Sequence, residues 1–155
     1  KPALTKIMVA FQDWEMPALY GGRSAYRSLL YRSGEKQALT LFLPSALLTL
    51  WANHYKHLVK RTRPCHLLED EEQIINKPRF YSFPSGHTTA SFAFATTALL
   101  RCQPAACLPI LFLAFMIGFS RIYLRVHYLT DVVCGMLLGS TCGIISVMLF
   151  NNVFS

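Results

Sequence analysis

Charged side chains are scarce in this chain of 155 residues, and acidic ones are the scarcest. Asp, Glu, Lys and Arg together make up 15% of the residues, against about 25% in ordinary soluble domains. Only 8 residues are acidic, whereas 15 are Lys or Arg, and 53% of the chain is hydrophobic. This composition argues against an ordinary soluble domain and directs attention to where the charges are missing.

The missing charges leave four long stretches without Lys, Arg, Asp or Glu. These stretches are 37–55, 80–100, 102–120 and 132–155. Each reaches the roughly 18 residues that a membrane-spanning helix needs. The alternative is a large soluble helical core. It is disfavoured, because four such stretches in so short a chain are more than a soluble core needs. The sequence therefore predicts a single all-α domain, 1–155, built as a polytopic transmembrane helical bundle with at least four spanning helices.

Motifs for metals and nucleic acids are also missing. The five cysteines show no metal-ligand spacing, and three of them fall inside apolar stretches as small hydrophobic residues: Cys107, Cys134 and Cys142. No nucleic-acid-binding motif accompanies the net charge of +7. The basic residues instead gather at the ends of the apolar stretches, where lipid headgroups would lie. We expect a membrane partner and no nucleic acid.

Residues 1–36 contain no stretch that is apolar for long enough to span a membrane. One helical face carries Leu4, Ile7, Met8 and Phe11. This pattern predicts a short helix that lies on the membrane interface or packs beneath the bundle. Residues 23–36 mix basic and aromatic side chains, which fits a segment on anionic headgroups or a solvated connector. We divide the domain into an interfacial segment, 1–36, and a helical core, 37–155.

One polar cluster lies between the last two apolar stretches. His127 and Asp131 are four residues apart, so their side chains would share one helix face. Asp131 would then accept a hydrogen bond from one imidazole nitrogen and leave the other nitrogen available for attack. A turn between helices would bring Arg121 to an anion. A nucleophilic His, its orienting Asp and an anion-binding Arg indicate phosphoryl chemistry.

Two further patterns precede this cluster. Pro84-Ser85-Gly86-His87 is a helix-start pattern, and a helix N-terminus favours an anion. Gly86 lets the backbone approach a ligand closely. Lys56 and Arg63-Pro64 follow the first apolar stretch, and their spacing alone also fits a basic helix end that touches lipid phosphates. In the last stretch, small residues that favour close helix packing are Gly135, Gly139, Ser140 and Gly143.

The combined pattern is K-x6-R-P, then P-S-G-H, then S-R-x5-H-x3-D. It resembles the signature of the type 2 phosphatidic acid phosphatase family, which also includes the vanadium haloperoxidases, and every specified residue matches. The resemblance implies that His127 is the nucleophile, that Asp131 orients it and that His87 is the general acid. The phosphate ligands that it implies are Lys56, Arg63, Ser85, Gly86 and Arg121.

The resemblance also implies a reaction. The chain would be an integral membrane lipid phosphatase that needs no metal or other cofactor and works through a phosphohistidine. Its substrate would be undecaprenyl diphosphate, phosphatidylglycerol phosphate, phosphatidic acid or lipid A phosphate. The alternatives are a lipid phosphotransferase and a non-catalytic lipid-binding or scaffold protein. A vanadium haloperoxidase is disfavoured because the known ones are large soluble proteins.

Counting spans places all three motifs at one face of the membrane. Eight Lys and Arg residues fall on that face and five on the other. Three of the eight are the expected phosphate ligands, so the remaining charges are balanced and give no orientation. The resemblance implies the bacterial inner membrane, with the active site facing the periplasm. Family members usually carry one or two helices before this part, so we expect either a trimmed or an unusually short member.

Overall fold

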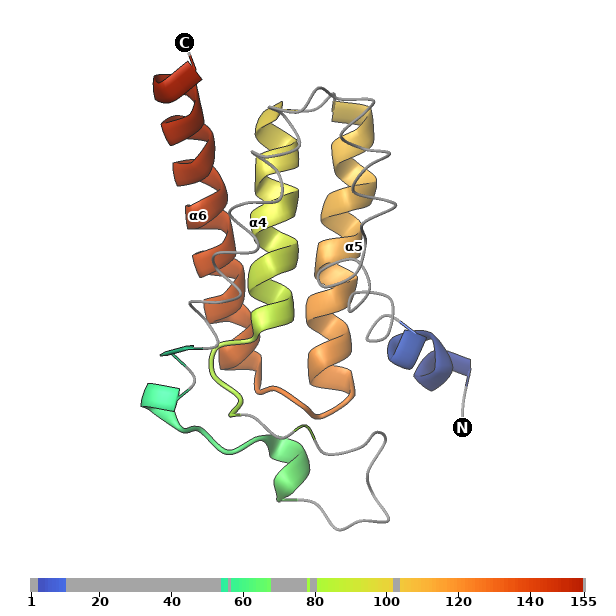
Figure 1. Cartoon of the computed structure of the whole chain (residues 1–155). Coiled ribbons are helices and arrows are strands. Elements are labelled where there is room, and N and C mark those ends of the chain that lie inside the picture. The colour runs from blue at the N-terminus through green and yellow to red at the C-terminus, as the bar shows by residue number, and fades with distance from the viewer. Residues whose placement is uncertain are drawn as a thin grey trace.

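The computed structural model describes residues 3–10, 54–55, 57–67, 78, 81–101 and 104–154. Within these residues the regular structure is helical, with no strand (Figure 1). In chain order the labelled elements are the 3-10 helix η1 (Pro64–His66), α4 (Gly86–Arg101), α5 (Pro104–Tyr123) and α6 (Leu129–Phe154). Residues 3–10 are also helical. The prediction of an all-α chain is confirmed for this part.

The three long helices stand side by side and alternate in direction (Figure 1). α4 lies between the other two and packs most extensively against α6, while α5 and α6 contact each other little. Short turns between successive helices impose this up-and-down arrangement. As a result, α4 and α6 both begin at the end of the bundle where α5 finishes.

Three glycines on α6, spaced four residues apart, form the face that packs against α4. A Cβ atom on Gly135 would lie 2.9 Å from the carbonyl oxygen of Ser85, and one on Gly139 would overlap the carbonyl oxygen of Thr89. A Cβ atom on Gly143 would lie 2.9 Å from the carbonyl oxygen of Ala93. The two backbones therefore approach more closely than any larger residue allows, as the small-residue pattern predicts.

One described helix is long and apolar enough to cross a membrane. It is the segment Leu129–Leu149 of α6, with 21 residues and a mean hydropathy of 2.1. At 1.5 Å per residue it covers about 31 Å, close to the ~30 Å hydrocarbon core of a bilayer. The apolar part of α5, Cys107–Tyr123, is shorter, and α4 has 16 residues. The predicted first span, 37–55, lies outside the described residues except at its last two positions.

Large apolar side chains cover the outer surfaces of α5 and α6. At least half exposed are Leu108, Phe112, Phe115, Phe119, Leu137, Met148 and Leu149. Soluble monomers rarely expose a continuous apolar surface of this extent, whereas lipid-facing helices require one.

The N-terminal helix, residues 3–10, packs at the end of the bundle where α5 finishes (Figure 1). Met8 is 1% exposed and belongs to one buried cluster with Cys65, Leu124 and Val126. The Thr5 hydroxyl lies 3.1 Å from the Tyr123 hydroxyl. Packing against the bundle is one of the two predicted alternatives for this segment. Residues 11–36 lie outside the described part of the chain, so the division at residue 36 stays a prediction.

Candidate active site

Two backbone hydrogen bonds bring the sequence motifs together at one end of the bundle. The Ser82 N–H donates to the carbonyl oxygen of Arg61 at 2.9 Å, which joins the two segments before α4. The Ser85 N–H donates to the carbonyl oxygen of Asp131 at 3.1 Å, which joins the start of α4 to the start of α6. The predicted meeting of the motifs at one end of the bundle therefore holds for their described residues.

The turn between α5 and α6 places His127 at this end of the bundle. The N–H groups of Val126 and His127 both donate to the carbonyl oxygen of Arg121, at 3.2 and 3.3 Å. Leu124 and Val126 are buried and anchor the turn. Arg125 has a φ of 57°, in the left-handed region that residues other than glycine rarely adopt. The turn leaves the His127 side chain 3% exposed.

His127 and Asp131 face each other, although they do not share one helix face as predicted. α6 begins at Leu129, so His127 precedes the helix and Asp131 lies in its first turn. The Asp131 Oδ2 atom accepts a hydrogen bond from the Tyr128 N–H at 2.9 Å and lies 3.5 Å from His127 Nδ1. A carboxylate in the first turn that reaches back to the N-cap N–H is a capping arrangement. Capping therefore fixes Asp131 where it faces the imidazole.

Arg63 contacts the opposite side of the imidazole. Its Nη1 atom donates to the carbonyl oxygen of Val126 at 3.0 Å and lies 3.2 Å from His127 Nε2. A proton on Nδ1, facing Asp131, leaves Nε2 as the acceptor for Arg63. Burial lowers the pKa of the Arg63 guanidinium, and the nearby Cys65 and Asp131 act in the opposite direction. An anion bound here would offset the cost of burying this cation.

Ser85 closes the site at the start of α4. It is fully buried, and its hydroxyl lies 2.9 Å from the Thr88 hydroxyl, while its carbonyl oxygen accepts the Thr89 N–H at 2.9 Å. Gly86 and His87 are the first two residues of α4. The N–H groups of a first turn, together with the helix dipole, favour an anion at this point.

The other two predicted phosphate ligands are Arg121 and Lys56. Arg121 is 2% exposed in the last turn of α5, directly before the turn that carries His127. Lys56 lies outside the described residues. His127, Asp131, Arg63 and Ser85 are joined by the contacts described above, and His87 and Arg121 lie in the adjoining helix ends.

Sequence reasoning missed Arg61, because it fell in the unspecified part of K-x6-R-P. Its Nη1 atom donates to Asp131 Oδ1 at 2.7 Å and to the Thr130 hydroxyl at 2.7 Å. Its guanidinium carbon lies 4.1 Å from the centre of the Tyr128 ring. Residues 61–63 form no helix, and in extended backbone alternate side chains point the same way. Arg61 is two residues before Arg63, so this spacing could have predicted that both side chains point toward the site.

Comparisons with known proteins give a family model and several named relatives. The family model described as PAP2 superfamily matches residues 37–155. An undecaprenyl-diphosphatase of Sulfolobus acidocaldarius is 28% identical over 121 residues, which cover 78% of this chain and 59% of that protein. A lipid A 1-phosphatase of Rhizobium johnstonii is 30% identical over 159 residues, which cover 94% of this chain and 60% of that protein. The chain thus spans about 60% of the length of these relatives.

The fold is also similar to a solved structure. The crystal structure of Aquifex aeolicus LpxE superposes with a TM-score of 0.78 at 29% sequence identity. The match covers 96% of this chain and 87% of that one. This agreement over nearly the whole chain supports the arrangement of helices described above.

Proposed function

The chain is an integral membrane protein that belongs to the PAP2 superfamily, and from this premise we propose that it hydrolyses a lipid phosphate or diphosphate. One observation supports this most strongly. His127 is held between a carboxylate at Nδ1 and a guanidinium at Nε2. The carboxylate orients a nucleophilic imidazole, and the guanidinium lies where a phosphoryl oxygen would approach it.

In the first proposed step, His127 Nε2 attacks phosphorus in line with the bond to the leaving oxygen. The new P–N bond forms as that P–O bond breaks, and the phosphoryl group becomes a phosphohistidine. Asp131 keeps the remaining imidazole proton on Nδ1 and stabilises the charge that develops on the ring. His87 donates a proton to the leaving oxygen.

Cations and backbone amides hold the non-bridging oxygens during this transfer. Their charge persists in a loose transition state, so fixed positive groups supply most of the stabilisation. We assign this role to Lys56, Arg63 and Arg121, together with the Ser85-Gly86 start of α4. In the second step a water molecule attacks the phosphohistidine, with His87 accepting its proton, and phosphate leaves.

The substrate is a lipid, because the site lies at the end of an apolar bundle. The relatives named undecaprenyl-diphosphatase and lipid A 1-phosphatase make undecaprenyl diphosphate and lipid A phosphate the first candidates, followed by phosphatidylglycerol phosphate and phosphatidic acid. We propose that the four charge-free stretches each span the membrane. On the family resemblance, we also propose that the site faces the periplasm from the bacterial inner membrane.

Radiolabelled lipid phosphates test the proposal. Wild-type protein should release phosphate from at least one of the four lipids and form an acid-labile phosphoenzyme after rapid quenching. His127→Ala should do neither, and His87→Ala should slow both steps by about 10²–10⁴-fold. His66→Ala is the matched control, because His66 lies in η1 at the same end of the bundle and is exposed.

Two results would count against the proposal. An acid-labile phosphoenzyme in His127→Ala protein would exclude His127 as the nucleophile. Transfer of the label to an added acceptor lipid, with no phosphate released, would make the protein a phosphotransferase.

A further inference from the structure

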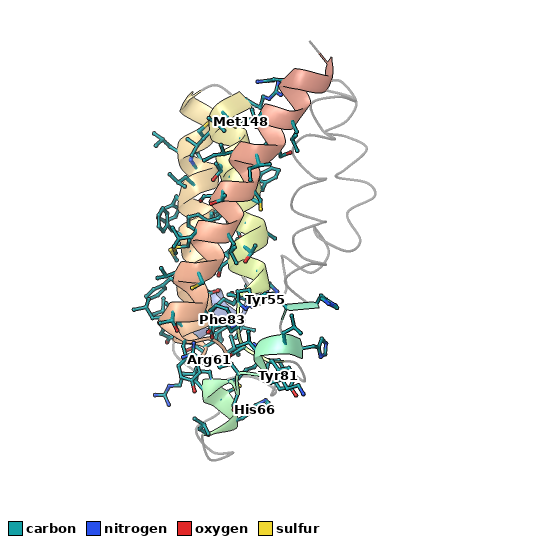
Figure 2. The ribbon with its side chains drawn as sticks, turned by 90° about the vertical axis from the view of Figure 1, so that its left-hand side faces the viewer. Tyr55, Arg61, His66, Tyr81, Phe83 and Met148 are labelled. Atoms are coloured by element: carbon teal, nitrogen blue, oxygen red, sulfur yellow. The ribbon has the colours of Figure 1, made fainter. Side chains whose placement is uncertain are left out.

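Arg61 contacts three residues at the start of α6 through one guanidinium group. It donates to Asp131 Oδ1 and to the Thr130 hydroxyl, and it stacks over the Tyr128 ring. Figure 2 labels Arg61 at the end of the bundle where α6 begins, opposite Met148. A planar guanidinium suits this combination of hydrogen bonds and stacking, which a lysine ammonium does not reproduce.

The two oxygens of Asp131 have separate partners. Oδ2 faces Tyr128 N–H and His127 Nδ1, and Oδ1 accepts the short 2.7 Å hydrogen bond from Arg61. A carboxylate held at only one oxygen keeps the freedom to rotate about its Cβ–Cγ bond. Because Arg61 holds the second oxygen, that rotation is blocked and Oδ2 stays directed at the imidazole.

The backbone of Arg61 is fixed as well. Its carbonyl oxygen accepts hydrogen bonds from the N–H of Ser82 at 2.9 Å and from the Ser82 hydroxyl at 3.2 Å. Ser82 is fully buried, so these bonds are shielded from water. The Arg61 side chain is about one-third exposed, yet it extends from an anchored backbone. Arg61 thus connects the segment before α4 to the first turn of α6.

We propose that Arg61 is a positioning residue of the active site, which locks the Asp131 carboxylate toward His127 and balances its negative charge. This inference rests on the proposed function, because positioning matters only if His127 is the nucleophile. The negative Asp131 carboxylate favours binding of a second proton to the imidazole, and the positive charge of Arg61 weakens this effect. Arg61 therefore keeps His127 in the neutral form that attacks phosphorus at neutral pH.

Other charged or titratable groups near His127 have to be held constant in a test. Asp131 on α6 and Arg63 before η1 contact the imidazole. Arg121 at the end of α5 and His87 in the first turn of α4 lie in the adjoining helix ends. Substitutions of Arg61 leave all four in place. Any change in the titration of His127 then reports the loss of Arg61.

The variants are Arg61→Gln, which removes the charge and the donor fork, and Arg61→Lys, which keeps only the charge. Arg125→Gln is the matched control, since it removes the same charge from an exposed arginine in the α5–α6 turn. The first readout is the pH titration of ¹³Cε1-labelled histidines by NMR in detergent micelles, with His127 assigned by its loss in His127→Gln. The second is kcat and KM as functions of pH.

Arg61→Gln should raise the midpoint of the His127 titration and shift the acid limb of kcat/KM to higher pH. By analogy with the outer partners of metal-bound histidines, it should lower kcat by about 10- to 100-fold. KM should stay within about threefold of wild type, since Arg61 is not among the proposed phosphate ligands. Arg61→Lys should titrate like wild type with a partly restored kcat, and Arg125→Gln should change neither readout.

An unchanged or lowered His127 midpoint in folded Arg61→Gln protein, with kcat equal to that of Arg125→Gln, overturns the proposal. If Arg61→Gln does not fold, Arg61→Lys tests the proposal in its place. A wild-type kcat in Arg61→Lys would overturn the proposal, because it would show that the guanidinium hydrogen bonds are not needed. The titration uses no substrate. A shifted midpoint in a protein that hydrolyses no lipid phosphate would therefore reject the proposed function, while the effect of Arg61 on the His127–Asp131 pair would still be demonstrated.

Discussion

At the scale of single residues, Lys60 has a φ of 51°, although its side chain is exposed. A residue with a Cβ costs roughly 1–2 kcal/mol in this left-handed region, whereas glycine adopts it without that cost. Lys60→Gly should therefore raise the free energy of unfolding, by less than about 1 kcal/mol after the greater freedom of glycine in the unfolded chain is subtracted.

Thermal unfolding in detergent measures this change. Lys60→Ala is the control, because it removes the same charge and keeps a Cβ atom in the left-handed region. Equal or lower stability of Lys60→Gly than of Lys60→Ala would show that the backbone at this position is not strained.

Asp131 offers a second prediction at this scale. Asn in its place keeps the size of the side chain but removes the negative charge that faces His127 Nδ1. By analogy with the same change in a serine protease triad, kcat should fall by up to about 10⁴-fold. KM should change little, because Asp131 is not among the proposed phosphate ligands. A kcat within twofold of wild type would exclude an orienting role.

The three cations proposed for the phosphate site lead to a third prediction. Lys56, Arg63 and Arg121 supply fixed positive charge, which in other phosphoryl-transfer enzymes comes partly from divalent ions. Activity should therefore persist in excess chelator, and vanadate should compete with the lipid as a phosphate mimic. Loss of activity in chelator that a divalent ion restores would refute the metal-free mechanism.

The spacing of residues was informative about which side chains meet and less so about local conformation. His127 and Asp131 were correctly placed side by side, but through a helix cap and not through a shared helix face. Arg61 escaped prediction because its importance comes from Asp131, which is 70 residues later in the chain. Only the folded chain brings the two together.

At the scale of helices, the contact between α4 and α6 depends on the absence of side chains on α6. A methyl group on Gly139 would overlap the backbone of Thr89 and lie 2.9 Å from the amide nitrogen of Ala93. Backbone atoms cannot move aside without separating the helices. Gly139→Ala should therefore destabilise the protein by about 1–3 kcal/mol and lower activity, because α4 and α6 both carry site residues.

Gly118→Ala is the matched control within α5. A Cβ there would lie 3.3 Å from Met136 Cε, the end of a flexible side chain, and 3.3 Å from Val132 Cγ1, so its nearest neighbours are side chains and not backbone atoms. Alanine also favours a helix over glycine by up to about 1 kcal/mol. Unfolding temperatures in detergent should thus fall for Gly139→Ala and stay level or rise for Gly118→Ala. The opposite order would show that the α4–α6 contact is looser than described.

Helix identity followed from the charge-free stretches, and the start of α4 followed from a different signal. The helix-start pattern Pro84-Ser85-Gly86-His87 agrees with a helix that begins at Gly86. The charge-free stretch 80–100 alone would start it too early, because residues 81–85 form the non-helical approach to the site. Hydrogen bonds from Ser82 and Ser85 to distant segments keep this approach out of the helix. Hydropathy alone carries no information about such partners.

At the scale of the whole molecule, the orientation in the membrane is open to a direct test. Leu67 is 73% exposed after η1 at the site end, and Asn151 is exposed near the far end of α6 (Figure 2 labels their neighbours His66 and Met148). In protein without its native cysteines, Leu67→Cys should react with a membrane-impermeant maleimide in intact bacteria. Asn151→Cys should react only after the cells are opened.

The native thiol at Cys65 is a poor reporter for this purpose, because it is 3% exposed. Activity of both variants in detergent is the control for folding. Labelling of Asn151→Cys, and not of Leu67→Cys, in intact cells would place the site on the cytoplasmic side.

The shared starting point of α4 and α6 has a consequence for the bilayers that this protein fits. Natural membranes differ in thickness by several ångströms, and each helical turn adds about 5.4 Å. All contacts to His127 described here lie where these two helices begin and α5 ends. Turns added or removed at the opposite ends would change the height of the bundle while the reacting atoms kept their places. The length of the helices can therefore change at the far end without altering the geometry of the proposed site. The same site is thus compatible with thin and thick bilayers.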